Sequence, residues 1–413
     1  MEMVRELPAN IIETLKTLKS NGFEGYIVGG GVRDILLNKI PNDYDITTNA
    51  LPEQVIEIFP KTIDIGTKHG TIGVIWGKND CPNGHPGNFP TADLATNPSD
   101  GLQKNYIEIT TYRIDGEYIN NRRPERVTFT PNLADDLRRR DFTINAMAWD
   151  GYGKIIDLFG GIKDLKNGII CCVGEANLRF SEDALRMLRA IRFAAQLGFI
   201  IESETYNAIC NNAELIKNVS AERIRIEFDK ILLSDNPKFL KVITDAGLGR
   251  FIFPELNINK FDIENLKTLP KQLDLRLAAL GEPILGLLDT LKYDNETKHS
   301  VALLVKYRNL QIKPTKTAVK QLLREIGEKN FLNLTELQNA VNLREIHFEI
   351  KQNCEAFTIS QLAINGHDLM KLGIKGKTIG EILQKLLDIV LENPDLNNTQ
   401  TLIGLVGEIR GGS

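Results

Sequence analysis

The chain has 413 residues, of which 42% are hydrophobic and 25% charged, a balance typical of a globular protein rather than a disordered or fibrous one. Its net charge of -4 means that a nucleic-acid partner would have to meet a local basic surface. The five cysteines form no Cys-x-x-Cys pair and no apolar run is long enough to span a bilayer, so we expect a cytoplasmic protein with reduced thiols and no membrane partner.

An apolar run, residues 26–28, predicts a strand that leads into three consecutive glycines, residues 29–31. The glycines would let backbone N–H groups approach an anion closely, and the helix predicted over residues 32–37 adds its positive end. Arg33 could neutralise a phosphate. The dinucleotide fingerprint fails, because Asp34 occupies its third glycine position. A plain turn is an equal alternative for these glycines.

Two aspartates follow with one residue between them. If residues 43–46 are extended, the side chains of Asp43 and Asp45 point to the same face. Two carboxylates on one face repel each other and a divalent cation relieves that repulsion, so we favour a metal site over an Asx-type turn. Glu108, in the strand predicted over residues 106–112, is a candidate third catalytic carboxylate, and an exposed strand glutamate is an equal alternative.

The remaining elements divide the chain into two kinds of structure. Residues 71–76 predict a further strand, and the segment 77–105, dense in Gly, Pro, Asn and Asp, predicts a long surface excursion. Farther along, the pattern changes to helical periodicity, with helices predicted over residues 182–197 and 220–233. Together these patterns predict an α+β head followed by an all-helical body.

Three consecutive arginines, residues 138–140, precede Asp141 and a largely apolar stretch. The apolar sequence favours a packed location, where Arg140 and Asp141 could serve a sugar and its phosphates. A solvated run of charges is an equal alternative for this segment.

Asp183 and Arg186 are three residues apart in the predicted helix and therefore adjacent on its surface. Taken alone, this spacing favours an ion pair within the helix. The functional alternative is base recognition, because a carboxylate accepts from an exocyclic amino group while a guanidinium donates to a ring nitrogen. Cytosine and adenine share that pattern, whereas uracil and guanine present the reverse. One such pair could select C and A without a nucleic-acid template.

Five motifs occur in order within residues 20–235: Gly-Gly-x-Val-Arg-Asp, Asp-Tyr-Asp-Ile, Arg-Arg-Asp-Phe-Thr-Ile-Asn-Ala-Met, Glu-Asp-Ala-Leu-Arg and Glu-Arg-Ile-Arg-Ile-Glu. Together they resemble the class II tRNA nucleotidyltransferases, the CCA-adding enzymes, and the related bacterial poly(A) polymerases. Residues 364–370 resemble a segment of the family's tail, so the resemblance extends toward the C-terminus.

The resemblance implies that Asp43 and Asp45 hold two Mg²⁺ ions, which activate the primer 3′-OH and stabilise the leaving pyrophosphate. It also implies a nucleotide-binding set: Gly30 and Arg33 for the triphosphate, Arg140 and Asp141 for ribose and phosphate, Asp183 and Arg186 for the base, and Arg189 and Arg192 for the pocket wall. Residues 115–123 resemble the flexible loop associated with A addition, which argues against an enzyme that adds only CC.

The implied fold is α+β, with a nucleotidyltransferase head built on a small mixed or antiparallel β-sheet and an elongated all-α neck, body and tail. The expected boundaries are residues 1–150 for the catalytic head, 151–235 for the neck that selects the base, 236–330 for the body and 331–413 for the tail that binds tRNA.

The implied activity is template-independent transfer of CMP, CMP and AMP from CTP and ATP to the tRNA 3′ end, with release of pyrophosphate. Two relatives on the same scaffold are alternatives: an A-adding enzyme that works beside a separate CC-adding one, and a poly(A) polymerase. The acidic chain lacks a basic C-terminal arm, which disfavours a polymerase acting on general RNA. A dinucleotide-binding oxidoreductase would explain the glycine turn but neither acidic motif.

Overall fold

The structure is a computed structural model that describes residues 7–76, 106–119, 121, 123–254 and 263–411. Contacts within the chain divide it into two compact units, Met1–Lys260 and Phe261–Ser413. This division is coarser than the four parts predicted from the sequence, which stay predictions. The predicted surface excursion, residues 77–105, lies outside the described residues, as do residues 120 and 122 of the predicted flexible loop.

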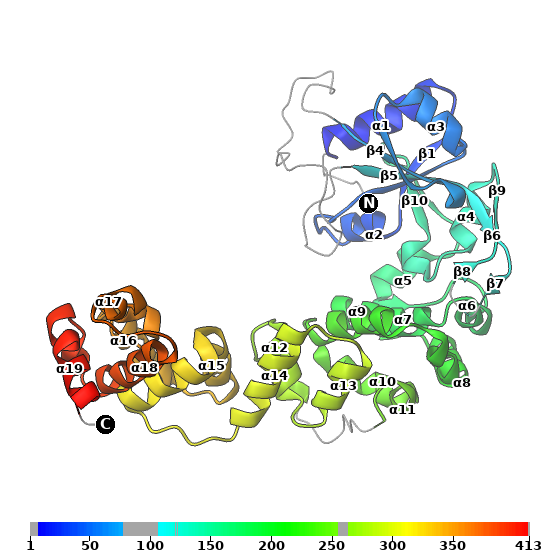
Figure 1. Cartoon of the computed structure of the whole chain (residues 1–413). Coiled ribbons are helices and arrows are strands. Elements are labelled where there is room, and N and C mark those ends of the chain that lie inside the picture. Colours follow the sequence, from blue (N-terminus) through cyan, green and yellow to red (C-terminus); the bar gives the residue numbers. More distant parts are fainter. Residues whose placement is uncertain (1–6, 77–105, 120, 122, 255–262, 412–413) are drawn as a thin grey trace. The chain divides into compact units, whose positions relative to one another are not determined.

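The first unit is built on a seven-stranded mixed sheet (Figure 1), which confirms the α+β fold class. In spatial order the strands are β11 (Ile155–Asp157), β10 (Met147–Trp149), β1 (Gly25–Val28), β2 (Asp45–Thr48), β5 (Ile107–Thr111), β4 (Thr71–Val74) and β3 (Thr62–Gly66). Neighbours pair antiparallel except β2 and β5, which are parallel. Short two-stranded sheets pair β6 (Arg113–Asp115) with β9 (Val127–Phe129), β7 (Tyr118–Ile119) with β8 (Arg123–Pro124), and β12 (Ile169–Ile170) with β13 (Ile200–Ile201).

Apolar packing fixes which way the side chains of β1 and β2 point. Val28 is buried in a cluster with Leu137 of α4 (Leu133–Arg138). Val28 is also the register partner of Asp45 in the antiparallel β1–β2 pair. Cross-strand partners share a face of the sheet, so Asp45 and, two residues later, Thr47 are directed toward the side that α4 covers.

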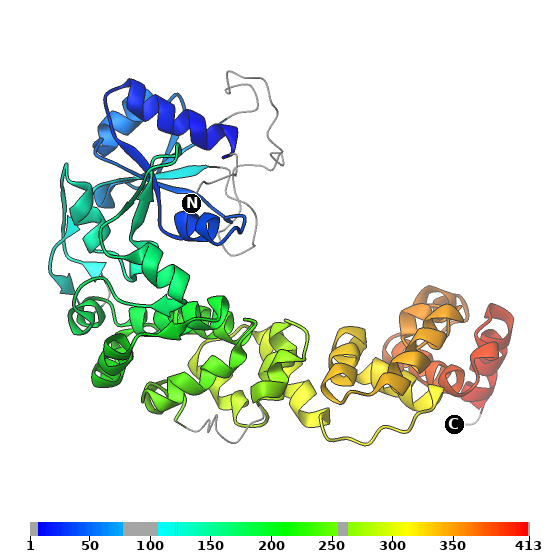
Figure 2. The ribbon, with the colours of Figure 1, turned by 180° about the vertical axis from the view of Figure 1, so that it is seen from behind.

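The other helices of the first unit surround and follow this sheet. They are α1 (Ala9–Ser20), α2 (Gly30–Leu36), α3 (Pro52–Ile58), α5 (Gly161–Asn167), α6 (Ala176–Glu182), α7 (Leu185–Leu197), α8 (Ser203–Asn212), α9 (Ala221–Leu232), α10 (Leu240–Asp245) and α11 (Gly249–Ile252). Figure 2 shows the sheet and the helices of the first unit from behind. A 3-10 turn, η2 (Thr143–Asn145), leads into β10.

One sequence prediction fails within these helices. The helix predicted over residues 182–197 is interrupted, because α6 ends at Glu182 and α7 begins only at Leu185. Asp183 has extended backbone angles, φ -133 and ψ 103, and its carboxylate accepts from the backbone N–H of Leu185 at 3.1 Å. This local hydrogen bond competes with continuation of the helix. Aspartate side chains commonly compete with helical hydrogen bonding in this way. The helix predicted over residues 220–233 is confirmed as α9.

The second unit is helical. Its helices are α12 (Leu273–Ala279), α13 (Ile284–Thr290), α14 (Asn295–Tyr307), α15 (Lys316–Leu337), α16 (Val341–Gln352), α17 (Gly366–Lys371), α18 (Lys377–Glu392) and α19 (Thr399–Gly411). Apolar side chains spaced along α18, from Ile382 to Leu391, are buried and form part of its core. Among the described helices of the whole chain, none is long and apolar enough to cross a membrane.

A close backbone approach sets the position of η2. Gly161 begins α5, and a Cβ built on it would collide with the carbonyl oxygen of Thr143 and lie 2.9 Å from its carbonyl carbon. We expect Gly161→Ala to lower the free energy of unfolding by about 2 kcal/mol, because the backbone must shift to make room. Lys163→Ala, an exposed change on the same helix, should alter it by less than about 0.5 kcal/mol. Urea unfolding of the two variants measures this difference, and equal stabilities would contradict it.

Candidate active site

A cavity of about 520 Å³ opens in the first unit between the sheet and α7. Its wall carries seven arginines and four aspartates, an excess of positive charge that suits a polyanionic ligand. The lining residues are Gly29, Gly30, Arg33, Asp43, Asp45, Arg139, Arg140, Asp141, Asn145, Asp183, Leu185, Arg186, Arg189, Arg192, Phe193 and Arg223. Every residue predicted from the sequence to bind the nucleotide is among them.

The glycine turn forms one part of the wall. Gly29 joins β1 to α2 at φ +69, a left-handed conformation that favours glycine. A Cβ at this position would lie 3.3 Å from Nη1 of Arg140, so the guanidinium rests against the turn. Arg33, on α2, donates from Nη1 to Oδ1 of Asn145 at 2.9 Å and from Nε to its neighbour Asp34 at 2.9 Å.

The carboxylates Asp43 and Asp45 line the same cavity, Asp43 exposed and Asp45 half-buried. Glu108 is the register partner of Asp45 on the parallel neighbour β5, but it is not part of the described cavity wall. Among the described residues, no three His, Cys, Asp or Glu side chains are grouped so as to hold a metal ion. The carboxylate oxygens of Asp43 and Asp45 on the cavity wall are the kind of donor that Mg²⁺ accepts.

Asp141 is a buried acid that organises three other polar side chains. Its Oδ2 accepts from Nε and Nη2 of Arg189 at 2.8 and 2.5 Å, and its Oδ1 accepts from Asn145 at 3.2 Å. Burial, the largest single influence, raises the pKa of this carboxyl, but the charge of Arg189 together with the hydrogen bonds from Arg189 and Asn145 and the charge of Arg186 lowers the pKa to about 2. Asp141 thus stays ionised, and through Asn145 it is connected to Arg33.

The predicted ion pair between Asp183 and Arg186 is wrong. Arg186 instead pairs with Glu182, Nη1 to Oε2 at 2.5 Å, and its Nη2 donates to the carbonyl of Arg139 at 3.0 Å. Asp183 pairs with Nη2 of Arg223 on α9 at 2.9 Å. The break between α6 and α7 removes the helical spacing on which the prediction rested. Both side chains nevertheless line the same cavity.

Arg192 and its neighbours rest on an aromatic ring. The Cζ of Arg192 lies 3.9 Å from the ring centroid of Phe193, and the Cζ atoms of Arg33 and Arg189 lie at 5.1 and 5.4 Å. At these distances the ring face attracts a cation. On its other side, Nε of Arg192 forms a buried ion pair with Glu227 of α9 at 2.5 Å.

The sequence analysis missed five residues that shape the cavity: Arg139, Asn145, Glu182, Phe193 and Arg223. Arg139 and Asn145 fall inside one of the five motifs, Glu182 begins another and Arg223 lies in the last, so their presence in those motifs was an available signal. The partners of Glu182 and Arg223 depend on the interrupted helix and on a contact between α7 and α9, for which a single sequence gives no signal.

The amino-acid sequence matches three family descriptions in order. They are the poly(A) polymerase head domain over residues 25–171, an RNA- and SrmB-binding site of polymerase A over residues 198–259, and domain 2 of tRNA nucleotidyltransferases over residues 277–406. The CCA-adding enzyme of Lactobacillus helveticus is 36% identical over 95% of this chain and 96% of its own length. That of Lactococcus lactis is 35% identical over 97% of this chain and 98% of its own length.

Solved structures give the same result. The Bacillus stearothermophilus CCA-adding enzyme in complex with CTP superposes with a TM-score of 0.78 at 31% identity, covering 98% of this chain and 99% of that one. The Thermotoga maritima CCA-adding enzyme complexed with tRNA-CCA, at 22% identity and a TM-score of 0.63, covers 98% of this chain and 97% of its own, and it shares the fold.

Two of the three glycines in the turn should respond differently to the same change. Gly29→Ala forces alanine into a left-handed conformation against Arg140, so we expect affinity for CTP to fall at least about tenfold. Gly31→Ala places its Cβ at ordinary distances, 3.4 Å from Cγ2 of Ile27 and 3.5 Å from the carbonyl oxygen of Asp43. The affinity of this variant for CTP should therefore stay within about twofold of wild type. Calorimetric titration with CTP measures both, and equal losses would contradict the assignment of the turn.

Proposed function

Because this chain belongs to the family of CCA-adding tRNA nucleotidyltransferases, we propose that it completes the 3′ end of tRNA, transferring CMP twice and AMP once from CTP and ATP. The observation that carries the proposal is a single cavity lined by both acidic motifs, Asp43 with Asp45 and Asp183 with Arg186. The first suits phosphoryl chemistry and the second suits recognition of a base. An oxidoreductase needs neither.

The arginines of the cavity would bind the triphosphate. Arg33 and Arg140 lie at the glycine turn, where charged hydrogen bonds to phosphate oxygens are strong and directional. Arg189, held by ionised Asp141, would stay fixed in the wall while the ribose and phosphates are placed beside it. In this proposal Asp141 acts on the nucleotide through Arg189 and Asn145 as well as by any direct contact with the sugar.

The base would be read by Asp183 and Arg186. The Asp183 carboxylate accepts from the exocyclic amino group of cytosine or adenine, and the Arg186 guanidinium donates to the adjacent ring nitrogen. Arg223 and Glu182 hold these two side chains from behind. Uracil and guanine would set their carbonyl oxygens against the carboxylate.

Bond formation would join the primer to the new nucleotide. The terminal 3′-hydroxyl of the tRNA attacks the α-phosphorus and loses its proton, while the bond to the β-phosphate oxygen breaks and pyrophosphate leaves. Asp43 and Asp45 would hold Mg²⁺, which supplies charge neutralisation at the attacking and leaving oxygens when bound. We propose that residues 1–150 perform this chemistry, 151–235 select the base, and 236–330 and 331–413 contact the tRNA.

Incorporation on defined primers tests this function. Incubated with Mg²⁺ and single nucleotides, the protein should add C to tRNA lacking CCA, C to tRNA ending in C, and A only to tRNA ending in CC. Extension of tRNA-CC alone would make it an A-adding enzyme, and long A tails on any RNA would make it a poly(A) polymerase. Absence of incorporation on every primer would overturn the proposal.

Removal of the base-reading carboxylate should relax nucleotide choice. In Asp183→Ala the preference for CTP over UTP should fall at least about tenfold, because one discriminating contact of this kind accounts for about 1–3 kcal/mol. Glu175→Ala, an exposed acid preceding the same helix α6, should leave the preference unchanged. The ratio of kcat/KM values for the two nucleotides measures this effect. A retained preference in Asp183→Ala would remove that residue from base selection.

A further inference from the structure

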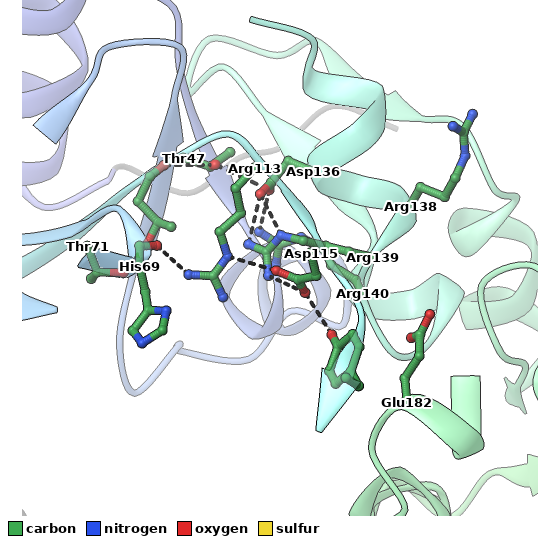
Figure 3. Close-up of polar contacts among 12 residues, drawn as sticks. Thr47, His69, Thr71, Arg113, Asp115, Asp136, Arg138, Arg139, Arg140 and Glu182 are labelled. Atoms are coloured by element: carbon green, nitrogen blue, oxygen red, sulfur yellow. Dashed lines mark hydrogen bonds and ion pairs between the residues drawn. The ribbon is translucent and has the colours of Figure 1, made fainter. Parts of the chain in front are cut away.

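Asp136, on α4, is a fully buried acid behind the cavity and is not part of its described wall. Its Oδ1 accepts from Nε and Nη2 of Arg139 at 2.9 and 2.8 Å, and its Oδ2 accepts from Nη2 of Arg140 at 3.2 Å. The hydroxyl of Thr47, on β2, lies 3.0 Å from the carbonyl oxygen of Thr110 and 3.3 Å from the same Oδ2, and it can donate to either acceptor. Figure 3 shows the carboxylate of Asp136 between the two guanidiniums and Thr47.

Most ion pairs elsewhere in the cavity wall are one to one. Arg33, Arg189, Arg192 and Arg223 each pair with a carboxylate of their own, respectively Asp34, Asp141, Glu227 and Asp183, whereas Arg186 shares Glu182 with Arg179. In the corner, three guanidiniums share two carboxylates. Arg139 and Arg140 share Asp136, and Asp115 contacts Arg113 at 3.2 Å and Arg139 at 3.9 Å. Positive charge is therefore in excess here.

The excess lies where a triphosphate would bind. Arg140 rests against Gly29 of the glycine turn, and Arg139 and Arg140 both line the cavity. Thr47 is two residues beyond Asp45 on the same strand and face, so Asp136 connects the arginines to the strand that carries the metal-binding carboxylate. A single buried group thus fixes two arginines relative to β2.

We propose that Asp136 is a positioning residue for triphosphate binding, because it holds Arg140 against the glycine turn and ties Arg139 and Arg140 to β2. It does not contact the substrate itself. The proposal rests on the function proposed above, since it assigns the corner to the triphosphate of CTP and ATP. The positioning role of Asp136 concerns the triphosphate, which CTP and ATP share, and selection of the base depends on other residues.

Charge and positioning predict opposite results when Asp136 is neutralised. Asp136→Asn keeps the shape but removes a negative charge near the cavity, so electrostatics alone would strengthen binding of a polyanion. The amide also has only one acceptor oxygen for two arginines, so one of them loses its fixed orientation. If positioning dominates, the affinity for inorganic tripolyphosphate should fall about tenfold, the scale of a lost charged hydrogen bond.

Calorimetric titration of the full chain with inorganic tripolyphosphate provides the test, and it needs neither RNA nor catalysis. Asp135→Asn is the matched control, because Asp135 is the neighbouring acid of α4 and pairs with exposed Arg138 at 3.4 Å. The control should bind within about twofold of wild type. Binding by folded Asp136→Asn that equals or exceeds wild type would overturn the proposal.

Steady-state kinetics distinguish a loss of arginine positioning from general disruption of the active site. In Asp136→Asn the KM values for CTP and ATP should rise together by the same factor as the tripolyphosphate dissociation constant. The KM for tRNA and the preference for CTP over UTP should stay unchanged.

If Asp136→Asn does not fold, a second variant provides the test. Thr47→Val removes the hydroxyl beside Asp136 and should weaken tripolyphosphate binding about threefold. Unchanged binding would then refute the proposal. If the variant binds tripolyphosphate more weakly but the wild-type protein incorporates no nucleotide, the proposed function is overturned while the positioning role of Asp136 stands.

Discussion

Repulsion among guanidinium groups is the constraint on which the first unit depends. Seven arginines face one cavity, and without compensation they would oppose folding of α4, α7 and α9 around it. The chain meets this constraint with buried carboxylates, Asp141 in the wall and Asp136 and Glu227 outside its described lining. The paired arginines still offer N–H groups to an anion, because each guanidinium has five donors.

Local sequence patterns were sufficient for the elements that depend on neighbouring residues. The strand before the three glycines and the helix that follows Ser220 both depend on spacing within a few residues. The strand predicted over residues 43–46 begins only at Asp45, so Asp43 lies just before β2. Ordered motifs then indicated the family, and the resemblance brought Arg140, Asp183 and Arg189 into one predicted site. Their presence in one cavity agrees with that prediction.

The partners of these residues depend on tertiary contacts and could not be predicted in the same way. The bond from Asp183 to the N–H of Leu185 interrupts a helix whose apolar spacing looks continuous. Once the helix is broken, Asp183 turns to Arg223, 40 residues away, and Arg186 turns back to Glu182. Glu108 illustrates the opposite case: its pairing with Asp45 follows from parallel strands, yet it is outside the described cavity wall.

The ring of Phe193 has a consequence that the ion pairs do not share. A carboxylate that holds an arginine occupies one or two of its N–H groups, whereas a ring face attracts the same cation and occupies none. Arg33, Arg189 and Arg192 all lie within 5.4 Å of the ring centroid. The ring of Phe193 therefore restricts the movement of three guanidinium groups and leaves their N–H donors available for a ligand. An aromatic side chain at this position thus preserves N–H donors that an additional acid would have occupied.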